Sequence, residues 1–143
     1  MKADCKNCAM SKLPDMHDPV VVESHPNDHI VIIGEAPGGH EAIEGRPFVG
    51  PSGSELQGAL DACGIDRSEC QINNVIACRP PQNKLDIFLA RIKKKDLGNP
   101  IECCRPRLMD DIEGYTKIIC LGSTAAAAIR GGHSSITVSY THL

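Results

Sequence analysis

The chain has 143 residues, a formal net charge of −3 at pH 7, and a composition that is 41% hydrophobic but only 3% aromatic, without tryptophan. This length fits one domain, whose core must be built from Ile, Leu, Val and Ala. The negative charge excludes a globally basic nucleic-acid-binding protein, so a basic footprint must be local, as at residues 91–95 (RIKKK), and no apolar run is long enough to span a membrane.

The first half of the chain predicts two strands and one helix. Residues 1–18 are polar, and residues 20–22 predict a short strand. Residues 29–34 form a hydrophobic run that predicts a buried strand. Ser52 and Glu55 have the spacing of a capping box, which predicts the start of a helix that stops at Gly64. Apolar residues follow this start at helical spacing, at Leu56, Ala59, Leu60 and Cys63.

The second half continues the alternation of strands and helices. Residues 71–77 and 117–121 predict strands, residues 84–97 predict a helix with a basic face, and residues 123–129 predict an alanine-rich helix. Asn99 followed by proline predicts another helix start. Such alternation is typical of the α/β class, so we expect a three-layer α/β/α domain around a central, mostly parallel sheet.

The loop from Gly34 to Gly53 (GEAPGGHEAIEGRPFVGPSG) is the strongest functional signal. It follows the predicted strand at 29–34, and open α/β sheets bind ligands at the carboxyl ends of their strands. Its glycines allow the backbone to approach a ligand closely. Connections between a strand and a helix are usually much shorter. The loop therefore predicts a substrate site.

Eight cysteines are unusually many, and the N-terminus shows no apolar signal segment. We therefore expect reduced thiols that bind a metal. Cys5 and Cys8 form a Cys-x-x-Cys pair, while Cys78 and Cys104 are isolated, so a metal would fasten the N-terminal arm to the sheet domain. Spacing alone leaves zinc and an iron–sulfur cluster open. Cys63, Cys70 and Cys120 are expected in the core, and Cys103 competes with Cys104 as a ligand.

The loop, the segment Asn74–Pro81 (NVIACRPP) and the segment Cys104–Leu108 (CRPRL) together resemble the family 4 uracil-DNA glycosylases, the iron–sulfur branch of that superfamily. The resemblance implies hydrolysis of the N-glycosidic bond of uracil in single- or double-stranded DNA, for base excision repair in the cytoplasm. It implies a monomeric full-length protein with no membrane partner. It also implies a four-iron four-sulfur cluster on the cysteines that match the family motif, namely Cys5, Cys8, Cys78 and Cys104.

The resemblance also assigns roles in the substrate site. Glu35 is the implied catalytic carboxylate. Other branches of the superfamily place a water-activating aspartate where this chain has Ala36, so the role of Glu35 as a general base stays open. Phe48 would stack on the flipped base, Asn74 would read its edge, and Glu41 would crowd out a 5-methyl group. The implied substrate-binding residues are Ala36, Gly38, Glu41, Phe48, Asn74 and Asn83, with Asn73 a weaker candidate for a polar contact.

The C-terminal part departs from the family pattern. Similar enzymes have a His-Pro-Ser loop there, and neither His133 nor His142 is followed by proline. We therefore expect residues 1–137 to form a glycosylase-like domain that is incomplete at its C-terminus and lacks the strand after the alanine-rich helix. Residues 138–143 (VSYTHL) are expected to be a non-native tail, and 84–99 an insertion. The alternative function is a module that binds uracil-containing DNA with little or no activity, because the His loop is missing.

Overall fold

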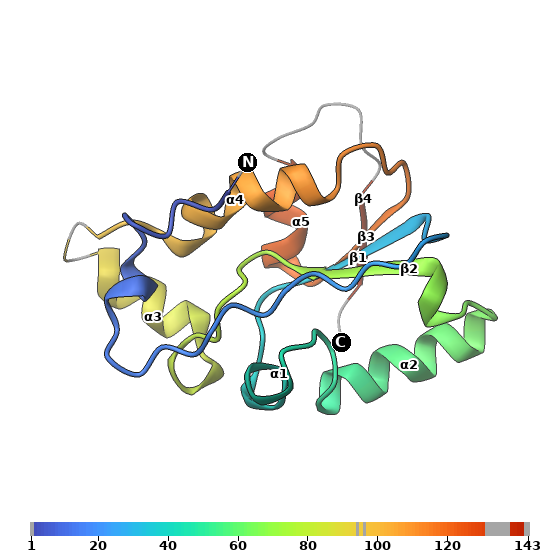
Figure 1. Cartoon of the computed structure of the whole chain (residues 1–143), viewed down its shortest axis with the longest axis horizontal. Coiled ribbons are helices and arrows are strands. Elements are labelled where there is room, and N and C mark those ends of the chain that lie inside the picture. Colours follow the sequence, from blue (N-terminus) through green and yellow to red (C-terminus); the bar gives the residue numbers. More distant parts are fainter. Residues whose placement is uncertain (1, 94, 96, 131–137, 142–143) are drawn as a thin grey trace.

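A four-stranded parallel sheet forms the centre of the molecule (Figure 1). The computed structural model describes residues 2–93, 95, 97–130 and 138–141. The strands have the spatial order β2-β1-β3-β4, and every neighbouring pair is parallel. Their bounds are β1 (Ile30–Gly34), β2 (Cys70–Asn74), β3 (Ile118–Leu121) and β4 (Val138–Thr141).

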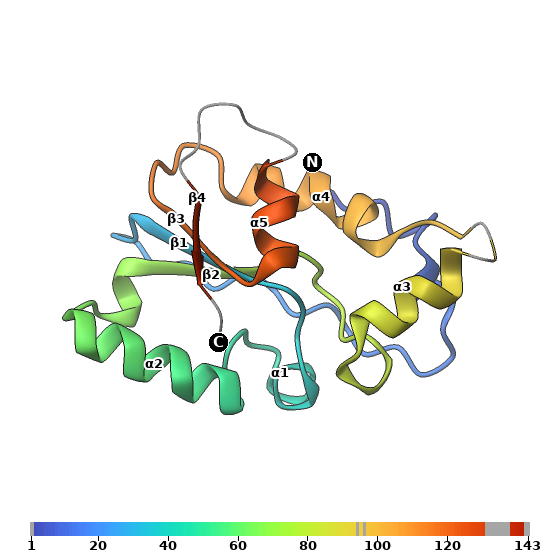
Figure 2. The same cartoon turned by 180° about the vertical axis from the view of Figure 1, so that it is seen from behind.

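Helices cover both faces of this sheet, as Figures 1 and 2 show from opposite sides. One face carries α4 (Pro100–Asp111) and α5 (Ser123–Arg130), and the other carries α2 (Pro51–Cys63). The side chains of β1 alternate between the two layers, as a strand's period of two requires. Val31 and Ile33 join the larger core cluster, whereas Ile32 packs in the smaller one with Leu56 and Leu60. The predicted α/β class with a parallel sheet is confirmed.

The remaining elements are short. They are α1 (Gly39–Glu44), α3 (Leu85–Lys93) and three 3₁₀ helices, η1 (Ala9–Lys12), η2 (Arg67–Glu69) and η3 (Pro81–Asn83). Helix α3 ends at Lys93, earlier than the predicted residue 97, and Gly98 pairs in parallel with Cys8 of the N-terminal arm. No helix in the described part of the chain is both long and apolar enough to cross a membrane.

The N-terminal arm (residues 2–29) runs along the domain without forming the strand predicted at residues 20–22. The amide of Val20 donates to the carbonyl of Ala77 at 2.8 Å, beyond the end of β2. Only Glu23 makes a bridge to the sheet, antiparallel to Ile72. The prediction of a strand here was wrong, because a single bridge does not make a ladder.

Two predictions about α2 were also wrong in detail. The helix begins at Pro51 with Gly50 as its N-cap, so Ser52 lies inside the first turn and does not cap it. Proline at the first helical position has a suitable φ and needs no hydrogen-bond acceptor. Cys63, expected in the core, is exposed. It shares the face of Leu56 and Leu60 but is the last helical residue, beyond the cluster that this face covers.

Helix α4 confirms its predicted start. The side chain of Asn99 accepts a hydrogen bond from the amide of Ile101 at 2.9 Å, and Pro100 follows the cap. The strand expected to be missing after the alanine-rich helix is present as β4, whose Val138 pairs with Ile118. The expectation of an absent strand was therefore wrong, while the origin of residues 138–143 stays a prediction.

Candidate functional site

A cavity of about 460 Å³ opens at the carboxyl ends of β1, β2 and β3. The loop after β1, the first turn of α2 and the turn at η3 complete its wall. Every residue predicted for the substrate site lines this cavity: Glu35, Ala36, Gly38, Glu41, Phe48, Asn74 and Asn83. The roles assigned to these residues stay predictions, but the fold brings all of them to one place. Asn73, the weaker candidate for a polar contact, does not line the cavity.

Gly34 allows Phe48 and Asn74 to meet at the centre of the cavity. A Cβ atom at position 34 would lie 2.5 Å from Cζ of Phe48 and 2.7 Å from Oδ1 of Asn74. Both distances are far below van der Waals contact, so only glycine fits. Gly34 pairs with Asn74 in the parallel register of β1 and β2. The register of the sheet therefore places the Asn74 amide beside Gly34, where the Phe48 ring from the loop also lies.

Phe48 holds a backbone conformation that is unfavourable for its residue type. Its φ is +52°, in the left-handed region, where a non-glycine residue costs on the order of 1–3 kcal/mol. This conformation requires glycine at position 53, because a Cβ atom there would lie 2.1 Å from the carbonyl oxygen of Phe48. Such strain persists only where surrounding contacts fix it, and it is concentrated at functional sites.

The backbone of Asn74 is held from behind by Arg107 of α4. The guanidinium donates to the carbonyl oxygens of Asn74 at 2.7 Å and Val75 at 3.1 Å. It also donates to Oδ1 of Asn73 and to Asp111, at 2.8 and 2.9 Å. Asn73 is thus a support residue: its Oδ1 accepts from the amide of Asn74 at 2.8 Å.

The side-chain amide of Asn74 makes no hydrogen bond to any described residue, although Asn74 is only 6% exposed. The side-chain amide of asparagine has one acceptor and two donors. Because Asn74 lines the cavity and its amide has no hydrogen-bond partner among the described residues, the amide is suited to bind a polar ligand. The fixed backbone and the vacant side chain together make Asn74 the best-placed recognition group in the cavity.

Glu41 presents a carboxylate to the same cavity. Its Oε1 accepts from the amide of Gly38 at 3.3 Å, which closes the first turn of α1. Its Oε2 is buried and has no partner among the described residues. A buried acceptor without a partner is costly.

Glu35 and Asn83 both line the cavity and are each held by a side-chain hydrogen bond. The hydroxyl of Thr124, at the start of α5, donates to Oε1 of Glu35 at 2.7 Å and so orients an otherwise exposed carboxylate. Asn83 has a φ of +59°, and its Oδ1 accepts from Nε of Arg79 at 2.7 Å. Sequence reasoning did not foresee the support roles of Thr124 and Arg107, because each acts on a residue distant along the chain, although Arg107 lies in the segment 104–108 that carries the family resemblance.

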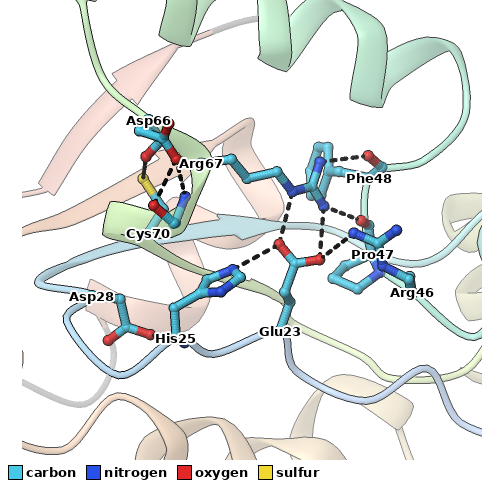
Figure 3. Close-up of polar contacts among 10 residues, drawn as sticks. Glu23, His25, Asp28, Arg46, Pro47, Phe48, Asp66, Arg67 and Cys70 are labelled. Atoms are coloured by element: carbon cyan, nitrogen blue, oxygen red, sulfur yellow. Dashed lines mark hydrogen bonds and ion pairs between the residues drawn. The ribbon is translucent and has the colours of Figure 1, made fainter.

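An ion pair between Arg67 and Glu23 lies beside the segment 46–48 (Figure 3). Nε of Arg67 donates to Glu23 at 2.7 Å, while its other two nitrogens donate to the carbonyls of Phe48 at 3.0 Å and Pro47 at 2.6 Å. Arg46 donates to the same carboxylate at 2.9 Å. No motif signalled this cluster, because its members are isolated charged residues from separate segments.

The charges of this cluster set the pKa of Glu23. Burial by itself would raise the pKa, but hydrogen bonds from Arg67 and Arg46 and the charge of Arg67 outweigh it and lower the pKa to about 2. The carboxylate therefore stays ionised throughout the range in which proteins usually work.

We expect this pair to make stability depend on pH at the acid end. The folded pKa lies below the ordinary value of 4.5, so the stabilisation is complete above about pH 4.5 and is lost as pH falls toward 2. At about 1.4 kcal/mol per pKa unit, it amounts to about 3 kcal/mol. The free energy of unfolding, measured in urea, should differ most between the parent and Glu23→Gln above pH 4.5 and converge below it. Glu55→Gln, an exposed control, should follow the parent, and a constant gap at all pH values would contradict the assignment.

A second cavity, of about 270 Å³, lies between the N-terminal arm and α4. Five cysteines line it: Cys5, Cys8, Cys78, Cys103 and Cys104. Burial, followed by the proximity of Cys104, Cys5 and Cys8, raises the pKa of Cys78 to about 11. Cys70 and Cys120 are buried elsewhere in the core, as predicted. The predicted ligands therefore share one cavity, together with their competitor Cys103.

These thiols do not form a closed site for a single ion. Within the part of the chain that the structure describes, no three His, Cys, Asp or Glu side chains gather closely enough to hold one metal ion. The arm is already attached here through its backbone, since the amides of Asp4 and Ala9 donate to the carbonyls of Cys103 and Gly98 at 2.8 and 2.9 Å.

Comparison with known proteins finds similar sequences over most of the chain. The family model described as the uracil DNA glycosylase superfamily matches residues 22–142. The type-4 uracil-DNA glycosylase of Archaeoglobus fulgidus is 35% identical over 127 residues, which are 87% of this chain and 58% of that protein. The type-4 enzyme of Pyrobaculum aerophilum is 36% identical over 129 residues, covering 88% and 59%. That of Thermotoga maritima is 46% identical over 65 residues, covering 46% and 34%. The chain thus spans less than two thirds of the length of these relatives.

Proposed function

Since the chain belongs to the uracil-DNA glycosylase superfamily, we propose that it excises uracil from DNA by hydrolysing the N-glycosidic bond, as a base excision repair enzyme. The observation that carries the proposal is the cavity in which the Phe48 ring and the vacant Asn74 amide meet over Gly34. This combination offers a flat apolar surface and a hydrogen-bonding edge, which are the two features that a flipped base requires.

Binding begins with a base turned out of the DNA stack, at a cost of a few kcal/mol. Stacking on Phe48 returns about 1–3 kcal/mol of this. Asn74 then reads the edge: its oxygen accepts from the ring N–H of uracil and its NH₂ donates to the neighbouring carbonyl. Cytosine presents the opposite pattern of donor and acceptor. A site built on such contacts discriminates against a mismatched analogue by about four orders of magnitude.

Cleavage develops positive charge on the sugar and negative charge on the departing uracil. Backbone amides of the loop after β1, such as that of Ala36, would stabilise the uracil anion, as preorganised donors do in oxyanion-type sites, whereas the amide of Gly38 already donates to Oε1 of Glu41. Glu35, oriented by Thr124 at 2.7 Å, would stabilise the sugar cation and position the attacking water. Because the hydroxyl of Thr124 satisfies one oxygen, the second oxygen of Glu35 remains for that water.

Glu41 is proposed to exclude thymine by occupying the space that a 5-methyl group would need. Glu41→Gly should therefore lower the preference for uracil over thymine by about 10- to 200-fold, the usual value of one methyl-sized difference in a pocket. The measurement is kcat/KM on matched oligonucleotides that contain one uracil or one thymine opposite guanine. Glu44→Gly, an exposed glutamate of the same helix, is the control. Equal preference in the parent and in Glu41→Gly would remove Glu41 from this role.

We further propose that Cys5, Cys8, Cys78 and Cys104 hold a four-iron four-sulfur cluster. The donor set fits: thiols from the arm, from the turn after β2 and from α4 line one cavity whose other walls include Met10, Met16 and Ile76. Thiolates in apolar surroundings are the usual ligands of such clusters. The cluster would serve as a structural link between the arm and the sheet, because hydrolysis of a glycosidic bond transfers no electrons.

The test of the proposed function is release of free uracil from an oligonucleotide with one uracil, by protein purified without oxygen. Alkaline treatment should then break the strand at the resulting abasic site, and a matched oligonucleotide with thymine should stay intact. Binding of uracil-containing DNA without release would instead support the alternative of a binding module. If the protein neither binds uracil-containing DNA nor releases uracil, the proposal is contradicted.

A further inference from the structure

We infer that Arg67 is a positioning residue for the base pocket: anchored by Glu23, it holds the backbone of Pro47 and Phe48 so that the Phe48 ring lies over the cavity. The inference rests on the proposed function where it takes this ring as the surface for uracil. The placement of the ring by Arg67 can be tested without any substrate.

The geometry joins three separate segments (Figure 3). Arg67 is the first residue of η2, which lies between α2 and β2 in the chain. Its side chain points toward Pro47 and Phe48. It donates to the carbonyls of Phe48 and Pro47 at 3.0 and 2.6 Å, and to Glu23 at 2.7 and 3.3 Å. Glu23 is in turn bridged to Ile72 of β2. The loop is therefore fastened through Arg67 to the edge of the sheet.

The burial of the pair makes this fastening strong. The side chain of Arg67 is 20% exposed and that of Glu23 is 11% exposed. Charge-assisted hydrogen bonds at such distances are roughly twice as strong as neutral ones, and the planar guanidinium fixes direction as well as distance. Arg46 provides a contrast: its side chain bonds the same carboxylate but is 60% exposed and donates no hydrogen bond to a loop carbonyl among the described residues.

Phe48 is the residue that most needs such a hold. Its φ of +52° is maintained although the residue has a bulky side chain. Without the two hydrogen bonds from Arg67, the backbone at Phe48 is free to relax toward negative φ, which would turn the ring away from Gly34 and Asn74. Arg67 would thus act on base binding only through the position of this ring.

The first experiment is a double-mutant cycle on binding. The probe is an oligonucleotide containing 2′-fluoro-2′-deoxyuridine, whose glycosidic bond resists cleavage because fluorine disfavours the sugar cation. Arg67→Gln should raise Kd about 10-fold in the parent, within the range set by base stacking, and by less than about 2-fold in a Phe48→Ala background. Arg46→Gln should leave Kd unchanged in both. An equal loss in both backgrounds would show that Arg67 acts on stability alone and would overturn the inference.

The second experiment observes the ring directly. The chain has no tryptophan, so Phe48→Trp introduces a single reporter at the pocket. Adding Arg67→Gln should increase collisional quenching of this reporter by acrylamide at least about 2-fold, because a released ring becomes more accessible to solvent. Adding Arg46→Gln should not. Unchanged quenching on adding Arg67→Gln would overturn the inference.

A milder variant guards against unfolding. Arg67→Lys keeps the charge beside Glu23 but cannot direct donors to both carbonyls, so it should retain the melting temperature of the parent and still increase quenching. Quenching unchanged in a folded Arg67→Lys variant would also contradict the inference. If the parent does not bind the fluorinated oligonucleotide, the proposed function fails, while the quenching experiment still decides the role of Arg67.

Discussion

Asn74→Ala is expected to reduce kcat/KM for uracil excision by about 10²–10³, the usual loss when one preorganised donor to a developing anion is removed. The reason lies in the position of the residue. Asn74 ends β2 opposite Gly34, its backbone is fixed by Arg107, and its side-chain amide has no hydrogen bond to any described residue. Truncation would remove both edge contacts to the base at once.

The same substitution should change specificity more than stability. The vacant amide makes no internal hydrogen bond among the described residues, so its removal should leave the melting temperature close to that of the parent. Discrimination against cytosine, measured on matched oligonucleotides, should fall by orders of magnitude. Asn27→Ala, at an exposed turn, is the matched control. Activity within threefold of the parent in a folded Asn74→Ala variant would place the recognition group elsewhere.

Cys78→Ser is expected to abolish the bound cluster and with it much of the stability of the arm. Parent protein made without oxygen should be brown and hold about four irons per chain. Because a structural metal centre can contribute on the order of 10 kcal/mol to folding, loss of one ligand should lower the melting temperature strongly. Cys5→Ser, Cys8→Ser and Cys104→Ser should behave alike in iron content and visible absorption.

Two further cysteines make this experiment selective. Cys63→Ser, at the exposed end of α2, should keep both colour and stability. Cys103→Ser tests the register, because Cys103 lines the same cavity as Cys104. We expect it to retain the cluster. Stoichiometric zinc without visible absorption in the parent would contradict the iron–sulfur proposal altogether.

What the sequence could predict was governed by local rules. Parallel strands end at one edge of a sheet, so the loop after β1 was expected to form a ligand site there, and Asn74, at the end of β2, lines the same cavity. The cap at Asn99 was predictable for the same reason, since capping depends on neighbouring residues.

The supports of the site could not be predicted in this way. Arg67 acts on Phe48 across 19 positions, Arg107 on Asn74 across 33, and Thr124 on Glu35 across 89. These pairings exist only once the sheet and its helices are assembled, and although Arg107 lies in the segment 104–108, its sequence does not tell which residue it contacts. The exposure of Cys63 has a similar origin: helical spacing gives the face of a residue but not the point at which the core beneath that face ends.

Helix α4 joins the two cavities in a way that has a thermodynamic consequence. Cys104 lines the cysteine cavity, and Arg107, one turn later, holds the carbonyls of Asn74 and Val75. A displacement of α4 therefore perturbs both sites together. Linked binding equilibria are reciprocal. If a filled cysteine cavity changes the free energy of uracil binding, bound uracil must change the free energy of cluster binding by the same amount. If that change is favourable, DNA that contains uracil should slow the loss of iron from the proposed cluster, and the loss should be slowest in protein bound to such DNA.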